Sequence, residues 1–174
     1  YGQRTLIHVS EADHVVFADV EKETTPGGVV EEADEEVLSM ARFLLDEIPD
    51  GGCIQLGIGG MPDVVGTLLA QSDLKDLGMH TELCSDAYVD LYDAGKLTNK
   101  LKTHNKGKGM TGIAFGTKKL YGWIDRNPAV SIAPLEYVNS PDVIAKHENM
   151  ISINSCISVD LYGQICAESA GTRH

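Results

Sequence analysis

The chain has 174 residues, of which 43% are hydrophobic, and its formal net charge is −12. This length is enough for one compact domain with a hydrophobic core of its own. Nucleic acids and anionic membrane surfaces are bound by clustered Lys and Arg, so the acidity argues against both as partners, although a local positive cluster could still bind a small anion. No apolar run approaches the roughly 20 residues that a membrane-spanning helix needs.

The start of the chain predicts extended segments, a turn and then a helix. Residues 5–9 and 14–18 indicate two short extended segments, and the Pro and Gly residues at 24–28 indicate a turn. Carboxylates stabilise the positive end of a helix dipole, and five acidic residues gather where a helix is expected to begin: Glu31, Glu32, Asp34, Glu35 and Glu36. Apolar residues at spacings of three and four continue this helix to Ile48, and residues 49–52 end it.

From residue 53 onward, strands and helices alternate. Strands are expected at 53–56, 79–84, 110–115 and 129–133, helices at 62–70, 86–94, 118–125 and 142–147, and further strands within 150–157 and 158–168, with a hairpin turn at Tyr162-Gly163. This alternation predicts an α/β fold with a largely parallel sheet and flanking helices. In such sheets, ligands bind at loops that leave the carboxyl ends of the strands. Two such places are the glycine turn after residue 56 and the segment around Glu82.

The four cysteines lie in apolar or strand-like surroundings: Cys53, Cys84, Cys156 and Cys166. They form no CxxC pair, and none has a His neighbour at the spacing of zinc ligands. The first residues show no signal-peptide pattern. We therefore expect buried, reduced thiols in a cytoplasmic protein.

Both ends of the chain look like cuts within a longer protein. The chain begins at Tyr1 without an initiator Met, and it stops at His174 directly after a predicted strand. We therefore interpret it as a fragment.

The glycine turn stands between a predicted strand and a predicted helix: Gly57, Ile58, Gly59 and Gly60. Backbone N–H groups in such a turn can bind an anion, helped by the N-terminus of the helix. Pro62 stands where a dinucleotide-binding fingerprint needs Gly, and no Gly-Lys-Ser/Thr follows as in a P-loop. On these residues alone, a tight structural turn is the simpler interpretation.

Two carboxylates and one basic cluster could carry chemistry. Glu82 ends a predicted strand and Glu168 precedes small residues, but an ordinary surface acid or capping residue explains each as well. The basic residues could meet a phosphate, although a solvated loop is the simpler interpretation: Lys100, Lys102, His104, Lys106 and Lys108. Asn139, in Asn-Ser-Pro, indicates a turn before a helix. No nucleophile-elbow motif is present.

Five long phrases of this chain resemble the acetyl-CoA hydrolase/transferase family, which includes butyryl-CoA:acetate and 4-hydroxybutyrate CoA-transferases. The phrases follow the order of the family and cover nearly the whole chain: LGIGGMPD, GMHTELCSDAYVDLYDAGKLTN, FGTKKLYGWIDRNP, PLEYVNSPDVI and NMISINSCISVDLYGQICAESAGT. The last two phrases are most similar to the butyryl-CoA:acetate enzymes.

The resemblance implies a protein more than twice as long, with two similar α/β domains of the NagB/RpiA-like kind and the active site between them. Residues 1–30 would connect from the absent N-terminal half, and residues 31–174 would form the first part of the C-terminal CoA-transferase domain. A glycine loop that helps to bind the thioester would follow His174. We therefore expect this chain alone to be inactive.

Carried over by the resemblance, the nucleophile falls on Glu82, and Glu168 is the alternative. Gly57, Ile58, Gly59 and Gly60 would line the acyl site, and Asn139 would lie near the nucleophile. An ionised carboxylate can attack a thioester without a base to remove a proton. The resemblance thus implies ping-pong transfer through an acyl-glutamyl anhydride and a glutamyl-CoA thioester, with no metal or permanently bound cofactor and with coenzyme A as part of the substrate.

The implied partners are an acyl-CoA, a short-chain carboxylate, the absent parts of the same enzyme and further copies of it in a homo-oligomer. Transfer from butyryl-CoA to acetate is the first hypothesis. A 4-hydroxybutyrate CoA-transferase and an acetyl-CoA hydrolase are alternatives within the family. The alternative from another class is a non-catalytic α/β module that binds a nucleotide-like ligand.

Overall fold

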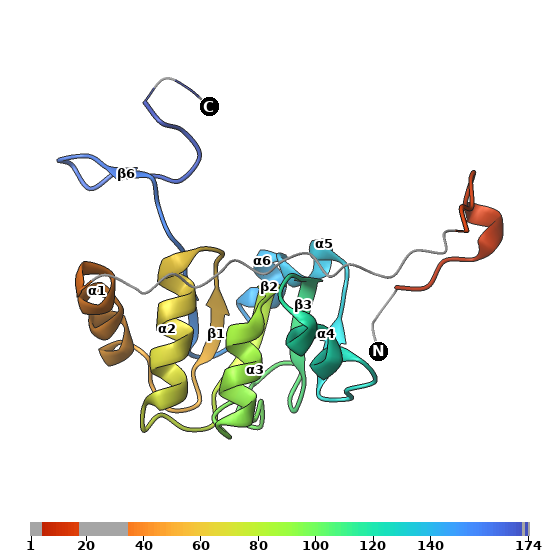
Figure 1. The fold of residues 1–174 in the computed structure, drawn as a ribbon, viewed down its shortest axis with the longest axis horizontal. Helices are drawn as coiled ribbons and strands as arrows, with labels where there is room; N and C mark the ends of the chain where they lie inside the picture. Colours follow the sequence, from red (N-terminus) through yellow and green to blue (C-terminus); the bar gives the residue numbers. More distant parts are fainter. Residues whose placement is uncertain (1–4, 18–34, 172, 174) are drawn as a thin grey trace.

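The computed structural model describes residues 5–17, 35–171 and 173, and its main feature is a five-stranded sheet (Figure 1). The strand order is β4-β3-β2-β1-β5, and all four neighbouring pairs are parallel. The strands are β1 (Cys53–Leu56), β2 (Gly78–Cys84), β3 (Gly109–Ala114), β4 (Val130–Ile132) and β5 (Met150–Ile153). The predicted α/β fold with a largely parallel sheet is confirmed.

The helices cover the two faces of this sheet unequally. The longer helices are α1 (Glu35–Asp46), α2 (Gly60–Gln71), α3 (Asp86–Asp93) and α4 (Lys118–Ile124), and the short ones are α5 (Leu135–Val138) and α6 (Pro141–Ile144). The crossovers through α2, α3 and α4 run in one direction across the sheet, and the connection through α5 and α6 runs back. Since such crossovers are right-handed, this reversal places α5 and α6 on the opposite face (Figure 1).

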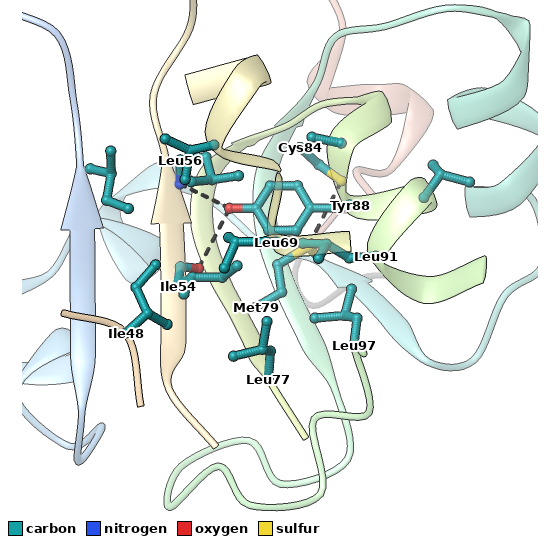
Figure 2. Close-up of a cluster of buried hydrophobic side chains, with 14 of the residues drawn as sticks. Ile48, Ile54, Leu56, Leu69, Leu77, Met79, Cys84, Tyr88, Leu91 and Leu97 are labelled. Carbon is teal, nitrogen blue, oxygen red and sulfur yellow. Dashed lines mark hydrogen bonds between the residues drawn. The ribbon is translucent and has the colours of Figure 1, made fainter. Parts of the chain in front are cut away.

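The apolar core lies between the sheet and the longer helices (Figure 2). Ile54 and Met79, on neighbouring strands, are fully buried against α2 and α3. Tyr88 of α3 is also fully buried, and its hydroxyl accepts a hydrogen bond from the Leu56 N–H at 2.9 Å and donates to the Ile54 carbonyl at 3.5 Å. The paired residues of β1 and β2 end at Ile54 and Met79, so the following backbone groups of β1 lack a partner on β2. The buried Tyr88 hydroxyl supplies that partner and is itself hydrogen-bonded.

The helix and strand predictions from residue 53 onward agree with the structure to within a few residues, with one omission. Helix α5 was not predicted, because Leu135 to Val138 is too short to show a helical period. The predicted hairpin is confirmed: β6 (Ser158–Val159) pairs antiparallel with β7 (Ile165–Cys166), and Gly163 adopts a φ of +80° in the turn between them. The predicted strand at 150–157 ends at Ile153.

At the start of the chain, the predicted helix is confirmed by α1, whereas the predicted extended segments form no strand and the first of them runs into a 3₁₀ helix. Residues 5–17 contain a 3₁₀ helix at Val9–Glu11 and form no strand. The His8 ring accepts from the Ser10 N–H, and the His8 N–H donates to the Glu11 carboxylate, so local bonds satisfy this segment in place of a strand partner. Residue 18, the turn at 24–28 and the acidic residues 31–34 lie outside the described residues, whereas Glu35 and Glu36 occupy the first turn of α1 as expected.

Candidate active site

Glu82 lies near the carboxyl end of β2, on the sheet face that α5 covers. Strand residues alternate between faces, so Glu82 shares a face with His80, whereas Met79 and Thr81 point to the other face. Met79 is buried in the core beneath α2 and α3, and His80 reaches α5. The Glu82 side chain itself is exposed. A carboxylate at this edge of a parallel sheet stands where such folds place their ligands.

Asn139 is the residue that the structure brings to this carboxylate. It follows α5 directly, as the C-cap of that helix, and its Nδ2 donates to Glu82 Oε2 at 2.8 Å. The two residues are 57 positions apart in the sequence. The interpretation of Asn139 as a turn residue before a helix also holds, since α6 begins at Pro141.

The glycine turn lies at the same edge of the sheet, where the strand order reverses between β1 and β5. The Gly57 N–H donates to the Ile153 carbonyl at 2.8 Å, so this donor is already used inside the sheet. Gly59 has a φ of +118°, a conformation that favours glycine, and a Cβ added at Gly59 or Gly60 would meet no neighbour within 4 Å. The backbone at Ile58, Gly59 and Gly60 is exposed and could approach a ligand closely.

The alternative carboxylate, Glu168, is not brought to Glu82. It follows β7, and the β6–β7 hairpin projects away from the sheet (Figure 1). Its side chain is exposed. Of the two acidic candidates, only Glu82 therefore joins another predicted site residue.

The basic cluster does not form one solvated loop, and this prediction was wrong for Lys102. The Lys102 side chain is only 3% exposed, and its Nζ donates to the carbonyls of Met79 at 2.7 Å and Lys108 at 2.5 Å. Burial lowers the pKa of Lys102 to about 8, against a smaller opposite effect of Cys53. Lys100, Lys106 and Lys108 are exposed, in agreement with the prediction. Lys102 thus serves as an internal donor to backbone carbonyls.

Three histidines form a buried to half-buried row beneath α5 and α6, a feature that the sequence analysis missed. The ring centroids of His80 and His147 are 4.5 Å apart, and those of His147 and His104 are 5.6 Å apart. His80 Nε2 lies 2.8 Å from the Val138 carbonyl oxygen, and His104 Nε2 lies 2.9 Å from the Tyr137 hydroxyl. The only sequence signal was the position of His80, two residues before Glu82 on the same face of a strand.

Burial and repulsion by nearby positive groups lower the pKa of each ring in this row, which favours the neutral forms. The pKa of His147 is lowered to about 3, first by burial and then by the charges of His80, Lys102 and His104. Burial also lowers the pKa of His80, which its bond to Val138 only partly opposes. The pKa of His104 is lowered by burial and by Lys146 and Lys102. Neutral imidazoles donate through one nitrogen only.

The cysteines are only partly as expected. Cys53 and Cys84 are buried free thiols, and burial raises the pKa of both. Cys156 is exposed and Cys166 is half-buried, so the expectation of burial was wrong for Cys156, which follows the end of the sheet at Ile153. Within residues 5–17, 35–171 and 173, no group of three or more His, Cys, Asp or Glu side chains is arranged to hold a metal ion. None of the helices in these ranges is long and apolar enough to cross a membrane.

Comparison with known sequences connects this geometry to one group of proteins. Residues 116–174 match the family described as the acetyl-CoA hydrolase/transferase C-terminal domain. The chain is 44% identical over 173 residues to a probable butyrate:acetyl-CoA coenzyme A-transferase of Syntrophomonas wolfei, covering 99% of this chain and 38% of that protein. It is 43% identical to the 4-hydroxybutyrate coenzyme A transferase of Clostridium kluyveri, covering 97% of this chain and 38% of that protein.

Solved structures give the same connection. RipA from Yersinia pestis matches with a TM-score of 0.85 and 36% identity, over 96% of this chain and 38% of that one. A 4-hydroxybutyrate CoA-transferase from Porphyromonas gingivalis matches with a TM-score of 0.81 and 38% identity, over 94% of this chain and 41% of that one. The chain therefore spans less than half the length of the relatives that it matches.

Proposed function

The chain belongs to the acetyl-CoA hydrolase/transferase family, and we propose that the full-length protein that contains it transfers coenzyme A from an acyl-CoA to a carboxylate, with Glu82 as the nucleophile. The observation that carries the proposal is the hydrogen bond of 2.8 Å from Asn139 to the Glu82 carboxylate, at the carboxyl edge of the sheet. The bond holds the carboxylate at the edge of the sheet where parallel α/β folds bind their ligands.

The first half-reaction forms two covalent intermediates. A Glu82 carboxylate oxygen attacks the thioester carbonyl, the C–S bond breaks, and coenzyme A leaves as a thiolate, which yields an acyl-glutamyl anhydride. The thiolate then attacks the glutamyl carbonyl of the anhydride. The donor carboxylate leaves, and a glutamyl-CoA thioester remains. The acceptor carboxylate reverses both steps, so no net proton transfer, metal or resident cofactor is needed, and coenzyme A enters as part of the substrate.

Asn139 is positioned for the oxyanion that forms on Glu82. When the thiolate adds to the glutamyl carbonyl, negative charge develops on a carboxyl oxygen of Glu82, and the Asn139 amide already donates to Oε2. A donor in place before the reaction stabilises this charge with little reorganisation, and losing one such donor typically costs about 10²–10³ in rate. The exposed backbone at Ile58, Gly59 and Gly60 is the proposed place for the acyl oxyanion, while Gly57 is excluded because its N–H is already bonded.

For the substrates, we propose butyryl-CoA as donor and acetate as acceptor. This choice is supported by the identity to the butyrate:acetyl-CoA relative, and 4-hydroxybutyrate is the acid to test beside it. A hydrolase would use the same two intermediates but would admit water to them, so exclusion of water separates the two activities. In the exposed setting of Glu82, that exclusion falls to the parts of the protein outside residues 31–174, which we propose form the rest of a two-domain homo-oligomeric enzyme.

The test is to incubate the full-length protein with butyryl-CoA and to map covalent adducts by peptide mass analysis. We expect a CoA-sized adduct on the peptide that contains Glu82, absent in Glu82→Gln and retained in the matched variant Glu168→Gln. An adduct on Glu168 would transfer the nucleophile to that residue. If no adduct forms and Glu82→Gln leaves every measurable function intact, the non-catalytic module replaces the transferase.

A parallel assay compares the acyl partners. We expect coenzyme A to appear on acetate faster than on 4-hydroxybutyrate, and little free coenzyme A to appear when no acceptor acid is present. Release of free coenzyme A at a rate similar to that of transfer would identify a hydrolase. Faster transfer to 4-hydroxybutyrate would keep the mechanism and change the substrate.

A further inference from the structure

His80 is a buried polar residue with no role in the chemistry proposed above. It is 1% exposed, two residues before Glu82 on the same face of β2. Burying an imidazole in the centre of a sheet is unfavourable unless its nitrogens are bonded. Only one of them is: Nε2 lies 2.8 Å from the Val138 carbonyl oxygen, and Nδ1 has no partner among the described residues.

The bond between His80 and Val138 has a definite direction. A carbonyl oxygen can only accept, so the ring donates through Nε2–H, and Nδ1 of the neutral ring carries the lone pair. Burial lowers the pKa of His80, and the positive charge of Lys102 acts in the same direction. The His147 ring, which follows α6, packs against the His80 ring at a tilt of 46°, and burial lowers its pKa to about 3. The ring of His80 therefore acts as a fixed single donor.

The acceptor of this bond belongs to the peptide unit that carries Asn139. Val138 is the last residue of α5, so its carbonyl has no partner within that helix. The carbonyl of Val138 and the N–H of Asn139 form one planar group. His80 binds the oxygen end of this group, and the Leu135 carbonyl accepts from its N–H end at 2.8 Å. The second contact is made by α5 itself and the first comes from β2, so His80 anchors the end of this four-residue helix from outside it.

We propose that His80 is a positioning residue, whose bond to the Val138 carbonyl orients the Asn139 amide on Glu82. The inference rests on the proposed function. His80 of β2 binds the Val138 carbonyl, and the next residue, Asn139, binds Glu82 of the same strand. The end of α5 is thus held between two residues of β2. A shift of about 1 Å in a group that contacts the reacting atoms can cost about 10²-fold in rate. Loss of the His80 donor would therefore act on catalysis through Asn139.

The experiment is a double-mutant cycle in the full-length protein, with transfer from butyryl-CoA to acetate as the assay. We expect His80→Leu to lower kcat about 10²-fold with a change in KM below about threefold. We expect His80→Gln, whose amide nitrogen can occupy the place of Nε2, to recover at least about tenfold of that loss. In an Asn139→Ala background, His80→Leu should have no further effect beyond about twofold, because both changes remove one interaction.

Two controls separate positioning from folding. Leu69→Ala destabilises the apolar core beneath α2, on the opposite face of the sheet from His80, and should keep kcat per folded molecule within about twofold. If His80→Leu does not fold, His80→Asn and His80→Gln make the same comparison, since the shorter Asn amide cannot reach Val138 and the Gln amide can. A positioning role requires Gln to be the more active of the two. Equal activity of these variants, normal kcat in folded His80→Leu, or multiplicative effects of His80→Leu and Asn139→Ala would overturn the inference.

Hydrogen exchange provides a readout that does not depend on the chemistry. In His80→Leu, the backbone amide of Asn139 should exchange faster, because the peptide loses its contact at the carbonyl end. If the unmodified protein transfers no coenzyme A, the proposed function fails, yet this exchange still decides whether His80 holds the peptide. Unchanged exchange of residues 135–140 in the variant would show that it does not.

Discussion

The two faces of the sheet differ in what they bury. Under α2 and α3, the buried side chains are almost all apolar, and the Tyr88 hydroxyl is bonded to the backbone of β1. Under α5 and α6, the buried side chains include His80, Lys102 and His147, and three histidine nitrogens have no partner among the described residues. We call these the core face and the polar face. The difference suggests that stability is concentrated on the core face and chemistry on the polar face.

Lys102 shows how closely the polar face is nonetheless packed. A Cβ added at Gly78 would lie 2.6 Å from the Lys102 Cγ, so glycine is needed there for the lysine stem to cross the strand. The ammonium group then bonds to carbonyls of Met79 and Lys108. On this face, Lys102 and His80 donate to backbone carbonyls of the segments that carry Glu82 and Asn139. Burying these polar side chains costs stability, but their hydrogen bonds make the segments more rigid.

The largest expected effect is on the core face. Leu69 of α2 is fully buried, and Leu69→Ala removes apolar contacts and leaves a cavity, so we expect a loss of about 2–5 kcal/mol in the free energy of unfolding. Urea unfolding of the full-length protein measures it, with the exposed Thr67→Ala as control. Activity per folded molecule should stay within about twofold. A tenfold loss of that activity would mean that the two faces are not separate.

The next largest effect is on the polar face, where we expect a loss of activity with little change in stability. Asn139→Ala removes the donor to Glu82 and should lower kcat by about 10²–10³, equivalent to about 2.7–4 kcal/mol of transition-state stabilisation. The thermal midpoint should change little, because the side chain is exposed. Glu136→Gln, an exposed change in the same short helix, is the matched control. Normal kcat in Asn139→Ala would remove the main support for Glu82 as the nucleophile.

The third effect is a loss of stability at low pH that comes from His147. The pKa of His147 in the folded state, about 3, lies below the ordinary value of 6.5. Below pH 6.5, His147 therefore becomes protonated in the unfolded chain but stays neutral in the folded one. The folded state is thereby destabilised as the pH falls, by up to about 3 kcal/mol near pH 4. His147→Phe should flatten this acid limb in urea titrations at several pH values. An unchanged limb would show that His147 does not titrate in this range.

The smallest expected effect is the loss of stability when the Tyr88 hydroxyl is removed and its ring is kept. Tyr88→Phe keeps the buried ring of the core face but leaves the Leu56 N–H without its partner, at a cost of about 1–2 kcal/mol. Unfolding midpoints measure the loss, and kcat should stay constant. A fall in kcat would indicate that β1, and the glycine turn after it, moves when this bond is lost.

Much of the fold could be predicted, because helices and strands follow from local periodicity. The parallel strands from Cys53 onward and the hairpin at Gly163 carry their own signals of apolar period and turn residues. At Val9 an extended segment was predicted from a short apolar run, but such a run forms a strand only where a partner strand is available. Residues 5–17 have no such partner among the described residues, and a 3₁₀ helix forms at Val9–Glu11. Helix α5 was missed because four residues show no period.

The sequence by itself determined the α/β class, the family resemblance and the place of Glu82 at the end of a strand, since each depends on residues close together in the chain. The resemblance implied that Asn139 lies near Glu82, but only the tertiary structure decided how the two bond, that His80 binds the carbonyl before Asn139, and that Lys102 is buried. The physical reason is the reversed crossover after β4, which returns α5 to the opposite face of β2 and brings together residues 57 positions apart. No local pattern of residues encodes that contact.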